Sequence, residues 1–162
     1  DRCILYLPRT SLGYNARSVG QEVGMVRTVS NDVETTGQGD VRDISASVRH
    51  AVSESSFLAG ITTVAVVGST AGITTIEYEP GAIADFNRLL EQLAPRDGAY
   101  QHHERWGDDN GSSHVRAALI GPSLTVPFTH STLQLGTWQQ IVLVECDTRP
   151  RRRQVIVQII GE

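Results

Sequence analysis

The sequence predicts a single α+β domain, built on a mainly antiparallel sheet or sandwich with two main helices. Its 162 residues match the length of one ordinary domain. Both clear helical patterns lie before Pro95, whereas the second half consists mostly of short strand-like segments. Because helical and strand patterns are segregated along the chain, an α+β architecture is favoured.

The regular part of the chain begins with a strand. Residues 26–36 are rich in β-branched side chains and partly alternate, which favours a strand that ends at Gly37. The first 24 residues keep neither a strand nor a helix period, and the only methionine, Met25, follows them directly. We therefore expect residues 1–24 to be an extension outside a domain of residues 25–162, with Met25 as an original start. An ordinary N-terminal arm is the alternative.

Two helices and two strands are predicted next. Asp43 and Ser45 are candidate N-caps of a helix whose apolar face carries Val48, Ala51 and Val52. Residues 61–69 and 73–79 are β-rich runs that predict strands. A second helix follows Pro80 and ends at Pro95, because apolar side chains recur at helical spacing, at Ile83, Phe86, Leu89, Leu90 and Leu93.

The remaining segments predict a long loop and then strands. Residues 96–113 are polar and rich in turn formers, which favours a loop. Short strand candidates follow at residues 115–120, 124–128, 133–135, 137–145 and 154–160. The last two are the clearest, because both are dominated by valine and isoleucine. We expect them to form a hairpin around the arginine run at residues 149–153.

The composition excludes several classes of function. All 14 basic residues are arginine, and lysine is absent, which rules out a lysine Schiff base, a Gly-Lys-Ser/Thr phosphate loop and a kinase-type lysine. The formal net charge of −4 makes nucleic acid an unfavoured partner. No stretch approaches the about 18 apolar residues of a membrane span. Cys3 and Cys146 form no disulfide framework, and with no signal peptide at the start we expect a cytoplasmic protein.

Three of the five histidines gather in one segment. His102, His103 and His114 lie close together in the sequence, and the same loop carries Glu104, Asp108 and Asp109. Imidazole and carboxylate groups together suit a divalent metal or a general acid–base site; a solvated polar loop is the alternative. Glu77, at the end of a predicted strand, is a candidate carboxylate partner or else an exposed strand-end residue.

Two further features are candidates for a binding site. The run at residues 149–153 holds four arginines, whose planar guanidinium groups match phosphate; a solvated turn that blocks strand pairing is the alternative. Trp138 and Gln139 begin a predicted strand and are candidates to line a pocket, whereas the core is the usual place for tryptophan. No serine has a G-x-S-x-G context, which disfavours a serine hydrolase. No base is placed to activate Cys146 as a nucleophile.

Several longer segments together resemble the YjbQ-like family, a group of small proteins known as secondary thiamine-phosphate synthases. The resemblance runs from about Val26 to Glu162. It is carried, in order, by GSTAGITTIE (68–77), YQHHE (100–104), SHVRAALIGPSLTVPF (113–128), LQLGTWQQIVLVE (133–145) and RPRRRQVIVQIIGE (149–162). It implies a compact α+β domain that assembles as a homotrimer, with a polar site near the subunit boundaries.

The resemblance also implies which residues form that site. The family's catalytic and metal-binding positions fall on Glu77, His102 and His114. Its substrate-binding positions fall on Ser113, Trp138, Gln139, Arg151, Arg152 and Arg153. Many members carry a histidine where this chain has Gly68, so a three-histidine metal site would lose one ligand here. His130 is a candidate replacement.

Two hypotheses about function follow. The resemblance implies a transferase that condenses a pyrimidine-methyl diphosphate with a thiazole phosphate to give thiamine phosphate and diphosphate. Without lysine, the leaving diphosphate would be held by Arg151, Arg152 and Arg153 and by Mg²⁺ on carboxylates. Zn²⁺ is the alternative metal. The alternative is a non-catalytic trimer that binds a small phosphorylated ligand, another anion or a metal.

Overall fold

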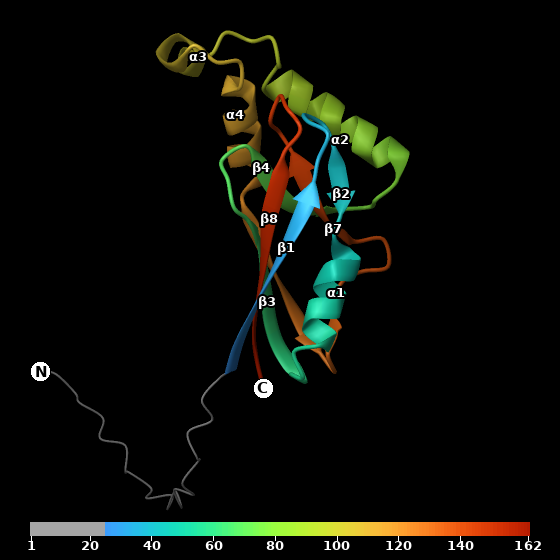
Figure 1. The fold of residues 1–162 in the computed structure, drawn as a ribbon. Coiled ribbons are helices and arrows are strands. Elements are labelled where there is room, and N and C mark those ends of the chain that lie inside the picture. Colours follow the sequence, from blue (N-terminus) through green and yellow to red (C-terminus); the bar gives the residue numbers. More distant parts are fainter. Residues whose placement is uncertain (1–24) are drawn as a thin grey trace, which may run out of the picture.

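Two antiparallel sheets face each other in residues 25–162, which are the residues that the computed structural model describes (Figure 1). The five-stranded sheet has the order β1-β8-β3-β5-β6, and the three-stranded sheet has the order β2-β7-β4. The strands are β1 (Met25–Glu34), β2 (Val41–Asp43), β3 (Ala59–Val66), β4 (Ala71–Ile76), β5 (Ser123–Thr129), β6 (Thr132–Leu133), β7 (Gln140–Glu145) and β8 (Arg152–Gly161). All paired strands run antiparallel, which confirms the predicted α+β class. The proposed extension, residues 1–24, lies outside the described residues.

Residues 25–162 contain four helices where two main helices were predicted. They are α1 (Ser45–Ser53), α2 (Pro80–Leu93), α3 (Gln101–Trp106) and α4 (Gly111–Ile120). The predicted strand at residues 115–120 is wrong, because this segment forms the second half of α4. Its sequence, VRAALI, is short and apolar, so periodicity alone cannot separate strand from helix. Its alanines, leucine and arginine are strong helix formers.

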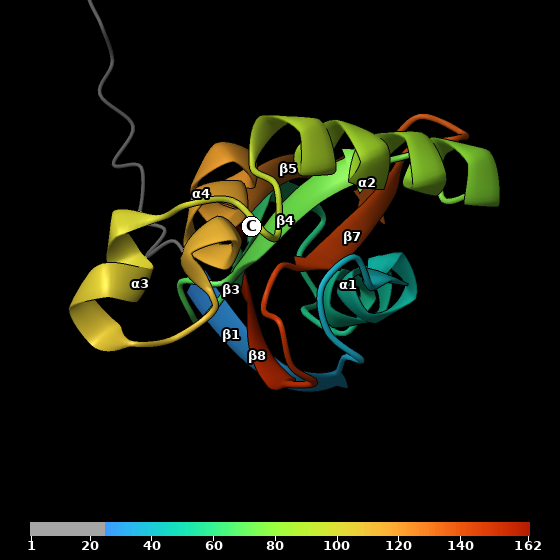
Figure 2. The same cartoon turned by 90° about the horizontal axis from the view of Figure 1, so that it is seen from above.

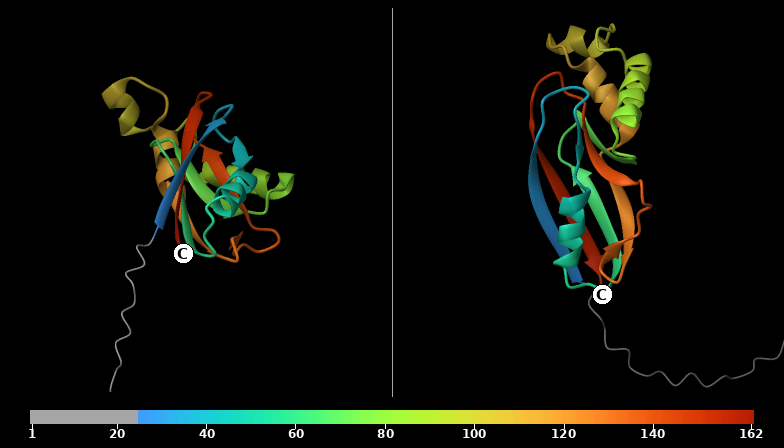
Figure 3. Two further views of the ribbon diagram at one scale, coloured as in Figure 1. Left: turned by 60° about the horizontal axis from the view of Figure 1, so that its bottom comes forward. Right: turned by 90° about the vertical axis from the view of Figure 1, so that its right-hand side faces the viewer.

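The main core fills the space between the two sheets. Inward side chains of β8 alternate along the strand, with Val155, Val157 and Ile159 buried, as the period of two requires. The core also receives Val48 and Val52 of α1. In Figure 3, α1 lies along one open side of the sandwich, between the five-stranded and three-stranded sheets.

A second core lies on the other face of the three-stranded sheet, beneath α2 and α4 (Figure 2). Val142 and Val144 of β7 pack there with Leu90 of α2 and Ala117 of α4. Strand β7 is therefore buried on both faces, which explains why its sequence is continuously apolar. The buried Arg116 fixes α4 to the end of α2, because its Nε donates to the Ala94 carbonyl at 2.9 Å.

The helix starts differ in part from the expected caps. For α2, the Glu79 carboxylate accepts from the Gly81 amide at 2.8 Å, and Pro80 occupies the first turn. For α1, the N-cap residue is Ile44 rather than Asp43 or Ser45. The Asp43 carboxylate still accepts from the Ser45 amide at 2.8 Å. The Ser45 hydroxyl instead accepts from the Ile141 amide of β7, so it ties α1 to the sheet.

The connection after β7 crosses between the sheets. The expected hairpin of residues 137–145 and 154–160 is wrong, because β7 and β8 belong to different sheets. Residues 146–151 carry the chain from one sheet to the other, and Arg152 and Arg153 already lie in β8. Within residues 25–162, no helix is long and apolar enough to cross a membrane.

Candidate functional site

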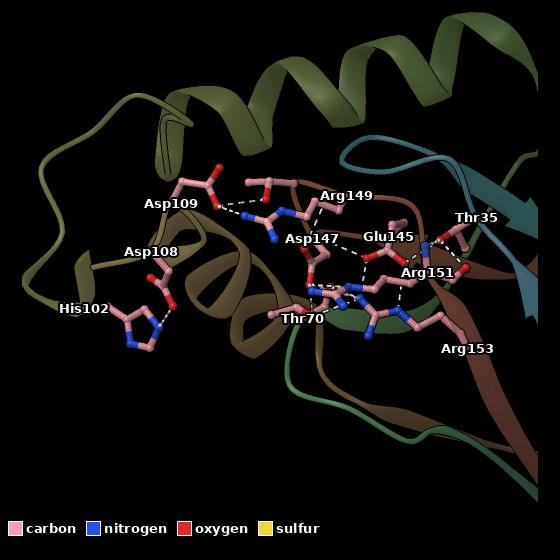
Figure 4. Close-up of polar contacts among 11 residues, drawn as sticks. Thr35, Thr70, His102, Asp108, Asp109, Glu145, Asp147, Arg149, Arg151 and Arg153 are labelled. Atoms are coloured by element: carbon pink, nitrogen blue, oxygen red, sulfur yellow. Dashed lines mark hydrogen bonds and ion pairs between the residues drawn. The ribbon is translucent and has the colours of Figure 1, made fainter. Parts of the chain in front are cut away.

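Two of the three clustered histidines meet where α3 projects beside α4. The rings of His102 and His114 lie 4.6 Å apart between centroids and are tilted by 55°. The His102 Nε2 lies 3.4 Å from Asp108 Oδ2, a distance that forms an ion pair when the imidazole is protonated (Figure 4). The structure therefore brings together His102 and His114, the two histidines that the resemblance assigns to the site.

The third histidine, His103, has a structural role. Its Nε2 accepts a hydrogen bond from the Gly111 amide at 2.9 Å, at the first residue of α4. The ring also packs against Tyr100 with centroids 5.3 Å apart. A Cβ on Gly111 would lie 2.5 Å from the Tyr100 Cβ, so this close approach requires glycine.

A pocket lies between α4 and the loop that joins β3 to β4. We call it the α4 pocket; it has a volume of about 340 Å³ and is lined by Gly68, Ser69, Ala71, His114, Ala117, Ala118 and Pro122. Small-molecule sites usually have volumes of about 300–1,000 Å³. His114 is the ionisable residue of this lining, and its ring contacts that of His102. The α4 pocket is thus a small, mostly apolar cavity with one member of an imidazole pair in its wall.

Ser113 stands next to His114 in the first turn of α4. Its side chain is fully buried. Its Oγ has no hydrogen-bond partner in the described part of the chain. An unpaired buried hydroxyl costs free energy, so Ser113 remains a candidate contact for a ligand.

A buried ionic network lies below this region (Figure 4). Arg153 Nε donates to Glu145 Oε2 at 2.7 Å, and Arg153 Nη2 donates to the Thr70 hydroxyl at 2.8 Å. Arg151 pairs with Asp147 at 2.9 Å. The Thr35 hydroxyl donates to Glu145 at 2.7 Å. The network joins the end of β7 to the start of β8.

The charges in this network stabilise one another. Burial alone would raise the pKa of Asp147, but hydrogen bonds from Thr70, Arg151 and the Arg149 amide outweigh it and lower that pKa below its ordinary value. Burial acts to lower the pKa of Arg153, yet the bond and ion pair with Glu145 raise it. Asp147 is therefore held as a carboxylate and Arg153 as a cation.

The arginine run is held largely by carboxylates of the same chain. Exposed Arg152 pairs with Asp32 at 2.7 Å and with Glu34 at 3.7 Å. Arg149 lies 3.7 Å from Asp109. The guanidinium groups of Arg149 and Arg152, two of the candidate phosphate ligands, thus lie beside carboxylates of the same chain. Glu145 and Asp147 were missed at the level of sequence, although acidic residues beside an arginine run are a signal for ion pairing.

Glu77, Trp138 and Gln139 lie away from the histidines. Ala71 pairs with Glu145 and Ile76 with Gln140, so β4 runs from the α4 pocket to the start of β7. At roughly 3.3 Å per residue, the strand spans about 17 Å. Beyond its far end, Gln139 Nε2 donates to the Thr75 hydroxyl at 3.2 Å, and Trp138 is 70% exposed rather than in the core. Within one chain, Glu77, Trp138 and Gln139 thus form a second cluster, separate from the histidines.

A sequence profile described as UPF0047 protein YjbQ-like matches residues 30–162. The chain belongs to this YjbQ-like family. A UPF0047 protein of Methanothermobacter thermautotrophicus is 34% identical over 137 residues, which make up 85% of this chain and 94% of the relative. The family resemblance drawn from the sequence motifs is therefore confirmed.

Solved structures of YjbQ-like proteins share the fold. A hypothetical protein from Aeropyrum pernix has a TM-score of 0.77 at 31% identity, covering 84% of this chain and 99% of that one. A protein of the family from Clostridium acetobutylicum has a TM-score of 0.74 at 34% identity, covering 82% and 99%. A Sulfolobus solfataricus chain, described as YbjQ-like and of unknown function, has a TM-score of 0.76 at 29% identity, covering 85% and 100%. These descriptions support the fold and the family and name no reaction.

The metal ligands that the YjbQ-like resemblance implies do not come together within this chain. Among residues 25–162, no three His, Cys, Asp or Glu side chains are grouped to hold a metal ion. Glu77 lies a strand length away from His102 and His114, so these three do not fit a metal within one chain.

His130 does not replace the family histidine at position 68. It forms with Ser131 the two-residue turn between β5 and β6, where the φ angles are 50° and 53°, as in a type I′ hairpin. Strand β5 begins next to Pro122 of the α4 pocket. At roughly 3.3 Å per residue, the turn lies about 20 Å from the pocket.

Proposed function

We propose that this YjbQ-like protein binds a small phosphorylated ligand in the α4 pocket. The observation that carries the proposal is the 340 Å³ cavity with His114 in its wall and the His102 ring against His114. Alanine and proline side chains form much of the remaining wall, and they suit a small apolar or aromatic body. A protonated imidazole and the Ser69 hydroxyl supply hydrogen-bond donors for phosphate oxygens.

Calorimetric titration of the full chain with phenyl phosphate tests this proposal. We expect measurable binding at pH 7, because the His114 imidazole in the pocket wall supplies an N–H donor for a phosphate oxygen. His114→Ala should weaken binding at least about tenfold, the size of effect that loss of one charged hydrogen bond produces. His50→Ala is the matched control, because His50 is exposed on α1. Equal affinity of His114→Ala and the wild type would refute the proposal.

The proposal includes a homotrimer in which neighbouring copies complete each other's site. Glu77, Trp138 and Gln139 are separated from the histidines within one chain, so a neighbouring copy is needed to bring the two groups together. Exposed apolar side chains on α2 and α4 support association of copies: Leu89, Leu93, Val115 and Leu119. Apolar side chains gathered on a surface favour a protein interface.

Light scattering and subunit mixing test this arrangement. We expect a particle of three times the 17.6 kDa chain mass. Trp138→Ala and His114→Ala variants should each bind phenyl phosphate weakly, because the first loses an exposed ring that would stack on the phenyl group and the second loses the imidazole. Unfolding and refolding them together should restore part of the sites, because some sites then receive both intact groups. A monomeric wild type, or no recovery in mixed trimers, would refute the shared site.

A second candidate function is the condensation that forms thiamine phosphate. It is favoured by the arrangement of His102 between Asp108 and His114, because a carboxylate beside an imidazole pair suits proton transfer. In this reaction a carbon–nitrogen bond forms between the pyrimidine methylene and the thiazole, while the carbon–oxygen bond to diphosphate breaks. Incubation with both precursors and Mg²⁺ should yield thiamine phosphate. Product no greater than that of the His102→Ala, His114→Ala double variant would exclude it.

A further inference from the structure

One wall of the α4 pocket is open because residue 68 has no side chain. The backbone of Gly68 has a φ of +146°, a conformation that residues with a Cβ rarely adopt. A Cβ built there would lie 3.1 Å from Arg153 Nη1. Gly68 itself lines the α4 pocket. The guanidinium is not itself part of the lining, but it lies next to Gly68, at the place that a side chain at position 68 would fill.

Arg153 has donors left over after its contacts with the protein. Its side chain is only 8% exposed. Its Nε and Nη2 donate to Glu145 and Thr70, whereas Nη1 makes no hydrogen bond to the described residues. A guanidinium carries two N–H groups on that nitrogen. A buried cation thus keeps unused donors on the nitrogen that lies next to Gly68.

We propose that Arg153 Nη1 binds the phosphate group of the ligand and that Gly68 is the specificity-determining residue that admits it. This inference rests on the proposed function of the α4 pocket and assigns the phosphate end of the ligand to Gly68. The phosphate would lie between Arg153 and His114, and its organic part would lie against Ala117, Ala118 and Pro122.

The charges favour one phosphate group over a diphosphate. Glu145 neutralises much of Arg153, and Asp147 is paired with Arg151 and lies 3.9 Å from Arg153 Nη2. One guanidinium edge and one imidazole then remain for the ligand. A diphosphate would add negative charge near two buried carboxylates without a further cation. The chemical class is therefore a phosphate monoester with a small apolar or aromatic body.

Two glycine variants separate the effect of a side chain at position 68 on binding from the effect of backbone strain. Gly68→Ala places a methyl group against Arg153 Nη1. Gly121→Ala is the matched control, because Gly121 has a φ of +92° and a Cβ there meets nothing within 4 Å. We expect Gly68→Ala to weaken phenyl phosphate binding at least about tenfold and Gly121→Ala to bind like the wild type. Circular dichroism and urea unfolding of both variants report any loss of folding.

A second measurement uses the wild-type protein. In ¹H–¹⁵N spectra of the arginine side chains, the Nε signal of Arg153, whose N–H donates to Glu145, is assigned through the bonds of its own side chain. It should shift on titration with phenyl phosphate and much less with pyrophosphate at equal concentration. An unmoved signal, or wild-type affinity in Gly68→Ala, would overturn the inference. If His114→Ala still loses binding in that case, the proposed function stands. If the wild type binds no phenyl phosphate, both fall.

Discussion

Arg153 at the start of β8 and Glu145 at the end of β7 form a buried two-point ion pair between the two sheets. Arg153 Nε donates to Glu145 Oε2 at 2.7 Å, while Nη2 donates to Oε1. Glu145 is 1% exposed and Arg153 is 7% exposed. The sequence predicts that β7 and β8 pair as a hairpin. They lie in different sheets, and this ion pair connects them through side chains instead.

Removing one partner of this pair should destabilise the protein strongly. Glu145→Ala leaves the Arg153 cation buried without its carboxylate, which typically costs about 3–5 kcal/mol in the free energy of unfolding. Urea denaturation at pH 7 measures the loss. Glu34→Ala is the matched control and should change stability little, because Glu34 is exposed on the outer face and touches only exposed Arg152. Equal losses in the two variants would contradict the assigned role.

Asp147 should make stability depend on acidity. Its pKa is lowered in the folded protein, so the carboxylate contributes stability above its ordinary unfolded pKa of about 3.9. That contribution is lost as the pH falls through the lower folded pKa. The stability difference between wild type and Asp147→Asn should therefore be full at pH 7 and shrink below about pH 4. Urea unfolding at several pH values measures it; a difference that grows in acid would contradict the prediction.

His103 should act on stability rather than on ligand binding. Its Nε2 accepts from the Gly111 amide, and losing a bond at a helix start typically costs about 1 kcal/mol. His103→Ala should lower the free energy of unfolding by that amount. His102→Ala is the control, because the His102 side chain is 33% exposed and bonds no helix amide. The assignment fails if His102→Ala destabilises the protein as much.

Cys146 should be unreactive in the folded protein. Burial raises the pKa of its thiol to about 12, so almost no thiolate is present at pH 8, and the thiolate is the reactive form. A Cys3→Ser variant leaves Cys146 as the only thiol of the chain. Its reaction with a disulfide reagent should be negligible in buffer and complete in urea. Rapid reaction without denaturant would show that this thiol is accessible.

The sequence predicted most strands because burial on a sheet leaves a local pattern. Alternation in β8 and the continuous apolar run in β7 both follow from the faces that these strands bury. The sheet to which each strand belongs leaves no such pattern, so the sequence predicts a hairpin between strands that are neighbours along the chain. Residues 115–120 were misassigned for a related reason, because packing of Ala117 against the second core decides their helical form.

The candidate site was predictable where its residues lie close together in the sequence, on elements that follow each other in the chain. His102 and His114 were expected together and meet through α3 and α4. Glu77 was expected with them, but β4 carries it away from the α4 pocket. Pairing of Arg153 with Glu145 depends on a crossing between sheets, which spacing in the sequence does not encode.

That the α4 pocket binds a phosphate monoester is tested most directly by a crystal structure with phenyl phosphate. We expect ligand density in the pocket, with the phosphate against Gly68 and within hydrogen-bond distance of His114 and Arg153 Nη1. The phenyl ring should contact Ala117 and Ala118. Density only on the exposed Arg149 or Arg152, with the α4 pocket free of ligand at saturating concentration, would contradict the claim.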